Sequence, residues 1–586
     1  MKRTHTCGAL RKKDKDNFVV LQGWVHSRRD HGGVIFIDLR DRYGLTQIVF
    51  TPDKVALFKE AEHLRREDVV EVHGQVSPRK AGMTNPTLET GEVEVFISEL
   101  KILNKSEVAP IEVDDRIAAT DEMRLTYRYL DLRRPLMQNR LLIRHKAMQA
   151  SREYLAAQGF LEIETPLFVK PTPEGARDYI VPSRVHPGKF YSLPQSPQLY
   201  KQLLMVSGCD RYFQLARCLR DEDLRADRQP EFTQIDVEMS FPELEDIYTF
   251  GEGVIKHMLK KAIGVDVATP FPRIPHKDAM AKYGCDKPDL RFELFLHDVT
   301  DIAKESEFSV FKSAVESGMI VKCICPQADF SRKDIDELTS FAVQLGAKGM
   351  AWMRVTQKGL ESSVVKYFNE DLQKKLLAKT GAKPGSTIFF IADTQKKTND
   401  ILAKLRLELG KKLNLIKDNE FKFCWVTDFP LFEWNEEEEK WDPAHHPFCM
   451  PIEEHLKFLE IDPGKVYCTQ YDMALNGVEI LSGSIRIHSP DIQERVMKVI
   501  GISKQEIEKK FGFLLEAFKY GAPPHGGFAF GFDRIVALMC GINDIREVIA
   551  FPKNKSCECP MDGSPSEVPA SALKELHIKT DVVSKK

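Results

Sequence analysis

The sequence predicts an α+β protein of several domains, with an OB-type β-barrel first, a strand-rich unit after it, and an α/β module inserted into that unit. Three observations support this prediction. The chain has 586 residues, which at about 150 residues per domain corresponds to roughly four domains. Residues 18–104 are dominated by alternation of apolar and polar side chains, the period of half-buried strands. Residues 289–420 instead alternate helical with strand-like segments, and strand-rich sequence lies on both sides of them.

The first domain, residues 1–104, is predicted to hold five strands and one helix. Three strands over residues 18–50 come first, an amphipathic helix over 53–67 follows, and alternating strands over 70–76 and 92–98 complete the pattern. This order matches a small barrel of the OB type. An unrelated β-sandwich is the alternative that this pattern leaves open.

The rest of the chain is divided by composition. A helix is predicted over residues 138–158, with Gly159 as its C-terminal stop. The predicted divisions are a polar hinge at 105–120, two parts of the strand-rich unit at 121–288 and 421–560, the inserted module at 289–420, and a C-terminal extension at 561–586.

Composition excludes several classes of protein. Hydrophobic residues make up 42% and charged residues 29%, with a net charge of −3; this is an ordinary globular balance, not that of a disordered, collagen-like or disulfide-rich chain. The twelve cysteines include no C-x-x-C pair, which argues against a structural zinc site and for a reducing compartment. Because there is neither a signal peptide nor an apolar run of about 18 residues, we expect a cytoplasmic protein without a membrane span.

A polar ligand site is predicted around residues 211–239. In the strand that ends at residue 239, Gln234, Asp236 and Glu238 share one face, and such a face is costly to bury unless it meets a polar partner. The loop before this strand begins at Arg220 and carries further arginines. A solvated, charged hairpin is the alternative for this segment alone.

A second element of the same site is predicted near the end of the chain. The glycine-rich strand that ends at Gly531 allows the backbone to approach a ligand closely. It runs through Phe532 and Asp533 to Arg534, at the start of a predicted helix, where the guanidinium is free to bind phosphate.

Together these segments resemble the three motifs of class II aminoacyl-tRNA synthetases: the strand and proline around Pro166, the Arg220-Asp221-Glu222 hairpin, and Gly531-Phe532-Asp533-Arg534. More closely, residues 172–179, 195–201 and 445–448 (TPEGARDY, QSPQLYK and HHPF) resemble the bacterial-type aspartyl-tRNA synthetases. The resemblance covers nearly the whole chain, including the inserted module, which that family shares with an amidotransferase subunit. It implies a catalytic domain built on an antiparallel sheet.

The resemblance also implies a reaction. L-aspartate would be joined to ATP with release of pyrophosphate, and the aspartyl group would pass to the 3′ end of tRNA(Asp) and also of tRNA(Asn). Because a carboxyl group with a pKa near 3.9 is already ionised at pH 7, catalysis would rest on positioning and charge neutralisation. The alternatives are a strictly discriminating enzyme, a catalytically silent tRNA-binding relative, or a sister enzyme for asparagine or lysine.

Roles for individual residues follow from the resemblance alone. Arg220 and Arg534 are the implied catalytic residues. The implied aspartate-binding residues are Glu174, Gln198, Lys201, Arg220, Asp236, His445 and Arg486. The implied ATP-binding residues are Arg220, Asp221, Glu222, Gln229, Glu479, Gly531, Phe532, Asp533 and Arg534. Asp472 and Glu479 would hold Mg²⁺, and the chain would form a homodimer with the Pro166 region at its interface.

Two of these assignments carry a structural expectation. Arg486 and Lys201 would bind the side-chain carboxylate of aspartate, since an arginine fork suits a carboxylate better than a neutral amide. Glu479 and Arg486 are an odd number of residues apart and would face opposite sides of a regular strand. We therefore expect a bulge at Ser482-Gly483-Ser484 that brings both to one side.

In the barrel, the resemblance implies an anticodon site. Arg29, Phe36, Gln47 and Glu94 match its base-stacking and base-reading positions, although Phe36 could instead be a core residue. His31 and Gly82 match positions that accompany charging of both tRNA(Asp) and tRNA(Asn); the alternative for Gly82 is a simple turn.

Overall fold

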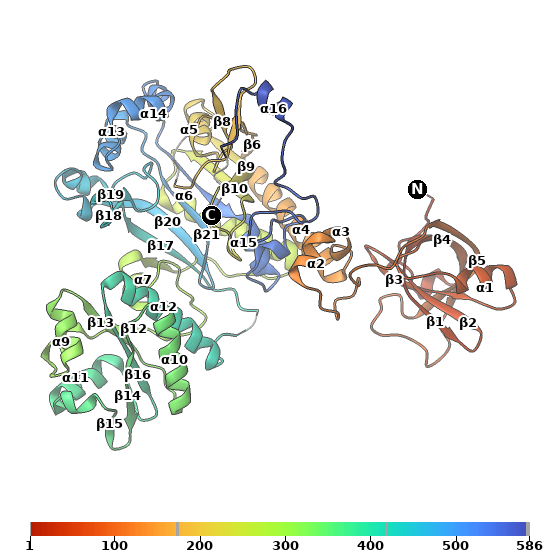
Figure 1. Cartoon of the computed structure of the whole chain (residues 1–586), viewed down its shortest axis with the longest axis horizontal. Coiled ribbons are helices and arrows are strands. Elements are labelled where there is room, and N and C mark those ends of the chain that lie inside the picture. Colours follow the sequence, from red (N-terminus) through yellow and green to blue (C-terminus); the bar gives the residue numbers. More distant parts are fainter. Residues whose placement is uncertain (1, 172–174, 418, 582–586) are drawn as a thin grey trace. The chain divides into compact units, whose positions relative to one another are not determined.

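The computed structural model describes residues 2–171, 175–417 and 419–581. They form two compact units, one of Met1–Ile143 with Arg546–Glu567 and one of Arg144–Ile545 with Val568–Lys586. The α+β prediction is confirmed: the first unit contains a five-stranded barrel, and the second contains an eight-stranded and a five-stranded sheet (Figure 1). No helix in the described part of the chain has the length and apolar character needed to cross a bilayer.

The barrel is closed, which excludes the sandwich alternative. Its strands, in the order β1-β2-β3-β5-β4, are β1 (Phe18–His31), β2 (Val34–Asp41), β3 (Gly44–Phe50), β4 (Val69–Pro78) and β5 (Val93–Asn104). Alternate side chains such as Val19, Leu21, Ile35 and Ile37 point inward and form the core. Helix α1 (Val55–Glu62) is shorter than predicted. Beyond it, Glu67 adopts a positive φ of 69° and its N–H bonds to the carbonyl of Val25, so that residue is not helical.

Short helices follow the barrel. Residues 105–120 form no helix or strand, and α2 (Asp121–Thr126), α3 (Arg128–Asp131) and α4 (Pro135–Ala157) come next. In this unit Arg124 bridges Asp131 and Glu547 at 3.0 and 2.7 Å. Helix α4 ends close to the predicted stop, where Gly159 has a φ of 80°.

The second unit is built on the eight-stranded sheet, in the order β11-β17-β20-β21-β22-β10-β9-β6. The strands are β6 (Leu161–Glu162), β9 (Arg211–Leu219), β10 (Glu231–Ser240), β11 (Arg273–Pro275), β17 (Phe423–Pro430), β20 (Tyr467–Leu475), β21 (Val478–Ile485) and β22 (His525–Gly531). The pairs between β17 and β9 are antiparallel, and only the two outermost pairs are parallel.

Smaller elements surround this sheet. Two hairpins are made by β7 (Ile180–Pro182) with β8 (Phe190–Ser192) and by β18 (Phe432–Asn435) with β19 (Lys440–Pro443). The helices are α5 (Gln198–Val206), α6 (Leu244–Ile263), α7 (His276–Lys282), α13 (Pro490–Val499), α14 (Lys504–Phe518), α15 (Phe532–Met539) and α16 (Ala570–Glu575).

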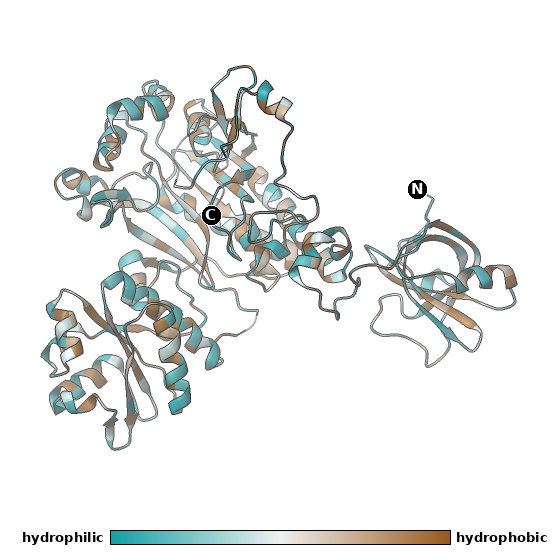
Figure 2. Cartoon of the chain, viewed as in Figure 1, coloured by the Kyte–Doolittle hydropathy of each residue, from teal (hydrophilic) through white to brown (hydrophobic). Residues whose placement is uncertain are grey.

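The inserted segment forms its own antiparallel sheet. Its order is β12-β13-β16-β14-β15, from β12 (Leu296–Asp298), β13 (Ile320–Ile324), β14 (Ala351–Thr356), β15 (Gly359–Glu361) and β16 (Thr387–Asp393). The helices that cover it are α8 (Thr300–Glu305), α9 (Ser309–Glu316), α10 (Arg332–Gln344), α11 (Glu370–Thr380) and α12 (Gln395–Lys412). Along β16, Ile388 and Phe390 pack with α8, α9 and α11, whereas Phe389 and Ile391 pack with α10 and α12. Figure 2 shows these strands mainly in the hydrophobic colours.

The predicted position of the bulge in β21 is wrong. Asp472 pairs with Ser482, but Ala474 pairs with Glu479, so the additional residue is Ile480. Gly483 lies in regular pairing between β20 and β22, where a Cβ atom would meet the Gly527 carbonyl oxygen at 2.2 Å. This glycine is therefore required for close approach of the strands rather than for a bulge.

Candidate functional site

A large cavity opens over one face of the eight-stranded sheet. Its volume is about 1210 Å³, and its walls come from the loop between β9 and β10, from β21, from the β22–α15 junction and from residues 445–448. The end of α12 contributes a further part of the wall.

The strand register places the polar residues of three strands on this face. Asp472 of β20 pairs with Ser482, Ser482 with Ala529, and Ala529 with Asp236 of β10, so these residues form one row. Glu238 lies in the next row, and the bulge at Ile480 brings Glu479 to the same face. The prediction of a polar face along β10 is confirmed by this register.

Four charged side chains form a buried network between β10, helix α5 and the residue after β21. Lys201 Nζ lies 2.7 Å from Asp236 Oδ1 and 3.2 Å from Glu238 Oε2, while Arg486 Nε lies 3.0 Å from Glu238 Oε1. Each of the four residues is 2% exposed or less. The two positive charges balance the two negative charges. Because the two carboxylates hold Lys201 and Arg486 in place, an added carboxylate would lie next to two cations in fixed positions.

The guanidinium of Arg486 donates hydrogen bonds through all three of its nitrogen atoms. Its Nε and Nη2 donate to Glu238, its Nη1 donates to Ser484 Oγ at 3.0 Å, and its Nη2 also donates to the Gly527 carbonyl at 3.1 Å. The His446 imidazole lies 3.1 Å from Nη1. Although burial alone would raise the pKa of Glu238, the charges of Arg486 and Lys201 lower it to about 2. Sequence analysis placed Glu238 on the correct face without assigning it this role.

Asp236 presents an acceptor without a partner. Its Oδ2 is buried and makes no hydrogen bond to any residue that the structure describes. Burial raises the pKa of Asp236, and the neighbouring charge of Lys201 opposes that shift. A ligand with N–H donors would satisfy this oxygen.

Arginines lie around the opposite part of the cavity. Arg220 and Arg534 both line it. Arg220 stacks over the Phe232 ring at 5.0 Å, and its Nε is buried without a hydrogen bond to any of the described residues. Arg534 is held loosely, by the Glu479 carbonyl at 3.2 Å and the Asp227 carboxylate at 3.5 Å. Both guanidinium groups therefore retain donors for an anionic ligand.

The remaining residues that the resemblance implies for ATP binding divide into those that line the cavity and those that do not. Glu222, Gln229, Glu479, Gly531 and Asp533 line the cavity. Asp221 and Phe532 are not in its wall: Asp221 forms a backbone bridge with Arg177, and Phe532 is fully buried. Asp533 also anchors the helix start, since its carboxylate accepts the Thr233 N–H at 2.7 Å and pairs with Arg144.

Asp472 and Glu479 form an acidic pair next to the cavity. Burial, and then the negative charge of Glu479, raise the pKa of Asp472 well above its usual value. A divalent cation would relieve this repulsion, and carboxylate oxygens are the ligands that Mg²⁺ prefers. In the described ranges no group of three or more His, Cys, Asp or Glu side chains is arranged to hold a metal ion. Mg²⁺ commonly takes one or two carboxylates and completes its ligands with water and phosphate, so the pair fits that ion.

The other implied aspartate-binding residues are placed as follows. Glu174 lies outside the described residues. Gln198 and His445 line the cavity, while Lys201, Asp236 and Arg486 are buried next to it. His445 also packs edge-on against Phe429 at 5.0 Å, and burial lowers its pKa.

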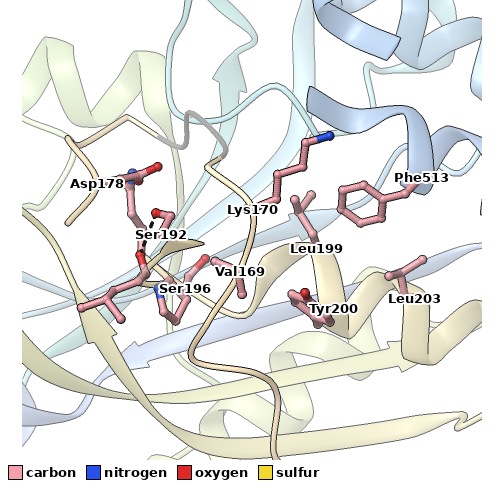
Figure 3. A pocket seen from close by; sticks show the side chains of 12 residues that line it. Val169, Lys170, Asp178, Ser192, Ser196, Leu199, Tyr200, Leu203 and Phe513 are labelled. Atoms are coloured by element: carbon pink, nitrogen blue, oxygen red, sulfur yellow. Dashed lines mark hydrogen bonds between the residues drawn. The ribbon is translucent and has the colours of Figure 1, made fainter. Parts of the chain in front are cut away.

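A smaller cavity of about 190 Å³ lies beside the first and shares Ser196 with it. Figure 3 shows Leu199, Tyr200 and Leu203 of α5 on one side and Phe513 of α14 opposite them. None of the site residues implied by the sequence lines this cavity.

In the barrel, most of the implied anticodon residues form one polar cluster. Arg29 Nη2 donates to Asp38 at 3.0 Å and lies 3.5 Å from Gln47 Oε1, and Gln47 Nε2 donates to Glu94 at 2.9 Å. Burial raises the pKa of Glu94. Asp38 was not predicted for this site: alternation along β2 gives its outward face, but its position beside Gln47 follows only from the pairing of β2 with β3.

Phe36 lies next to this cluster on the outer surface of the barrel. Its neighbours Ile35 and Ile37 belong to the core and Phe36 does not, so the alternative of a core residue is excluded. The ring centroids of His31 and Phe36 lie 6.5 Å apart. Strand pairing aligns Phe36 with Val49 and Val49 with the exposed Phe96, a second aromatic that sequence analysis did not identify. Gly82 has a φ of 80° with open space around it, as in a surface turn.

Comparison with known families gives two matches. Residues 120–555 match the class II tRNA synthetases (D, K and N). Residues 19–103 match the OB-fold nucleic acid binding domain.

Similar full-length proteins are also known. The aspartate–tRNA(Asp/Asn) ligases of Caldanaerobacter subterraneus and Desulfatibacillum aliphaticivorans are each 52% identical, over 99% and 100% of this chain and 99% of their own length. The aspartate–tRNA ligase of Ruminiclostridium cellulolyticum is 50% identical over 99% of this chain and 98% of its own. Among solved structures, asparaginyl-tRNA synthetase from Pyrococcus horikoshii has a TM-score of 0.60 at 19% identity and covers 94% of this chain and 98% of its own. At that identity the likeness concerns the fold alone.

Proposed function

The chain belongs to the class II tRNA synthetases (D, K and N), and from that premise we propose that it is an aspartate–tRNA ligase that charges both tRNA(Asp) and tRNA(Asn). It uses ATP to activate the amino acid, as class II synthetases do. The proposal is carried by a cavity lined by Arg220 and Arg534, together with a buried network in which Lys201 pairs with Asp236 and Arg486 pairs with Glu238.

The amino-acid end of the cavity suits aspartate. The side-chain carboxylate binds beside Lys201 and Arg486, whose positions are fixed by Asp236 and Glu238. A neutral amide in that place would receive no comparable stabilisation from two cations. The α-ammonium group binds towards the unpartnered Oδ2 of Asp236. Glu174 is proposed on resemblance alone.

The nucleotide end suits a triphosphate. Arg220 contacts the α-phosphate and the attacking carboxylate, so it neutralises charge that accumulates as the two anions approach. Arg534 binds the γ-phosphate, and Glu222 and Gln229 contact the nucleotide from the loop between β9 and β10. No general base is required, since the attacking carboxylate is ionised.

Mg²⁺ is proposed as the metal of this site. Asp472 and Glu479 would hold it, and when bound it would supply positive charge to the phosphates of ATP. The support is the acidic pair and the electrostatic repulsion within it.

The barrel is proposed to bind the anticodon. Phe36 stacks on an unpaired base, and Arg29, Gln47 and Glu94 read base edges. His31 and Gly82 are proposed to permit both tRNA(Asp) and tRNA(Asn), a proposal that rests on the two positions and on the Asp/Asn names of relatives. Because tRNA charging and twelve free cysteines both suit a reducing interior, we propose the cytoplasm as its location.

We also propose a homodimer. The exposed apolar side chains around Pro166 and the β7–β8 hairpin support it, since exposed clusters of this kind mark interaction surfaces. They are Leu161 at 56%, Leu167 at 53%, Phe168 at 59%, Ile180 at 59%, Phe190 at 41% and Tyr191 at 41%. The ring centroids of Phe168 and Tyr191 lie 5.3 Å apart.

Amino-acid specificity can be tested without tRNA. ATP–pyrophosphate exchange should proceed with aspartate and not with asparagine or lysine, because only aspartate brings a carboxylate to Lys201 and Arg486. Exchange that prefers asparagine would overturn the proposal, and absence of exchange with every amino acid would support a silent relative.

A further inference from the structure

A chain of hydrogen bonds leads from the backbone to the cavity wall. The imidazole Nδ1 of His525 lies 2.8 Å from the Pro523 carbonyl oxygen, and its Nε2 lies 3.0 Å from Gln202 Nε2. Gln202 Oε1 in turn lies 3.1 Å from Gln198 Nε2. Gln198 is at the start of α5 and lines the cavity, whereas His525 and Gln202 are fully buried.

The Pro523 carbonyl, at one end of this series of hydrogen bonds, fixes the direction of all the others. A carbonyl oxygen can only accept, so His525 Nδ1 carries the proton and Nε2 of the neutral ring is an acceptor. Gln202 must then present its NH₂ group to His525 and its Oε1 to Gln198. Gln198 must therefore donate through its own NH₂, which leaves its Oε1 as the atom without a partner among the described residues.

The surroundings of His525 keep the ring neutral. The charged and titratable groups that act on it are Glu238 of β10 together with Arg486 and His488 after β21. Burial is the main influence and lowers the pKa of His525. Glu238 and the hydrogen bond to the Pro523 carbonyl oppose this shift, while Arg486 and His488 add to it. A doubly protonated ring would place an N–H against the Gln202 NH₂ group.

We infer that His525 and Gln202 are positioning residues, which orient the carboxamide of Gln198 so that its Oε1 accepts from the α-ammonium group of the bound amino acid. This inference rests on the proposed function, because it needs aspartate in the cavity. With the reversed carboxamide, an NH₂ group would face a cation. The unpartnered Asp236 Oδ2 offers a second acceptor for the same group.

Two substitutions of His525 test the inference. His525→Leu removes the acceptor while keeping an apolar side chain, whereas His525→Gln can return an acceptor oxygen near the position of imidazole Nε2. We expect His525→Leu to raise the KM for aspartate in ATP–pyrophosphate exchange by about tenfold, the scale of one hydrogen bond to a charged group. The KM for ATP should stay within about twofold, and His525→Gln should recover most of the loss.

Phe518→Leu is the matched control. Phe518 is buried and its ring lies 6.2 Å from that of His525, so this change loosens the same packing without altering a hydrogen bond. If Phe518→Leu raises the KM for aspartate as much as His525→Leu does at a similar fall in Tm, the role of His525 is structural and the inference is wrong. An unchanged KM in a folded His525→Leu variant would overturn it as well. If the unsubstituted protein shows no aspartate-dependent exchange, the proposed function is refuted instead.

Discussion

At the scale of single residues, the site divides into cations that are held by several neighbouring residues and cations that are held by few. Arg486 makes contacts with four neighbouring residues through its guanidinium, and Lys201 contacts two carboxylates. Within the part of the chain that the structure describes, Arg220 and Arg534 make fewer such contacts. Substitutions in the first group should therefore affect stability as well as aspartate binding, and those in the second should affect binding alone.

Arg534 should show the binding effect. Its side chain is 28% exposed and its nearest carboxylates lie 3.5 and 4.0 Å away. Replacing Arg534 by Gln should raise the KM for ATP by about tenfold or more, since charge-assisted hydrogen bonds are lost, and should leave Tm unchanged. Arg495→Gln is the control, because Arg495 is similarly exposed but pairs with Glu460 away from the cavity. Equal effects of the two changes on the KM for ATP would contradict the assignment.

Glu238 should show the stability effect, with a defined pH dependence. Its pKa in the folded protein, about 2, is below the value of about 4.3 expected when unfolded, so the ionised group stabilises the fold at neutral pH. That contribution is lost as the pH falls from the unfolded towards the folded pKa. Glu238→Gln should lower the free energy of unfolding at pH 7 by about 3 kcal/mol, because it leaves two buried cations underneutralised.

The test of Glu238 is urea denaturation of the unsubstituted and Glu238→Gln proteins between pH 7 and pH 3. The difference between them should be constant above about pH 5 and should shrink below it. A difference that does not change with pH would show that Glu238 is not the depressed carboxyl group of the network.

At the scale of elements, alternation in the sequence predicts the strands of the barrel well, because each strand has one buried and one exposed face. Features that depend on a neighbouring strand are not predictable in this way. The bulge at Ile480 and the close packing at Gly483 are set by β20 and β22. Sequence reasoning reaches the site where residues share one strand, as Asp236 and Glu238 do. It does not reach contacts between elements, such as Asp38 beside Gln47 or the Gln198–Gln202–His525 hydrogen bonds.

The outer surface of the barrel offers a matched pair of aromatic residues. Phe36 lies beside the Arg29–Gln47–Glu94 cluster, whereas Phe18 is 59% exposed at the start of β1 and contacts His73. Phe36→Leu should raise the KM for tRNA by about tenfold, the scale of one lost base stack, with exchange in the absence of tRNA unchanged. Phe18→Leu should alter neither, and a similar rise in both variants would remove Phe36 from the proposed anticodon site.

At the scale of the whole molecule, we propose that the two units carry separable functions. The unit with the barrel holds the proposed anticodon residues, and the other holds the cavity and both clusters of the inserted module. Amino-acid specificity should therefore be decided in the second unit and tRNA specificity in the first. The motifs separate the two proposed sites, but the predicted boundaries differ from the two units, because residues 121–143 and 546–560, predicted as parts of the strand-rich unit, group with the barrel. The role of the inserted module has no motif that indicates it.

The most direct test of this account is aspartylation of purified tRNA(Asp) and tRNA(Asn) transcripts, measured side by side with ATP and Mg²⁺. We predict that both transcripts accept aspartate, with His31 and Gly82 permitting the second. Charging of tRNA(Asp) alone would contradict the relaxed specificity, and failure to charge either transcript would contradict the assignment as an aspartate–tRNA ligase.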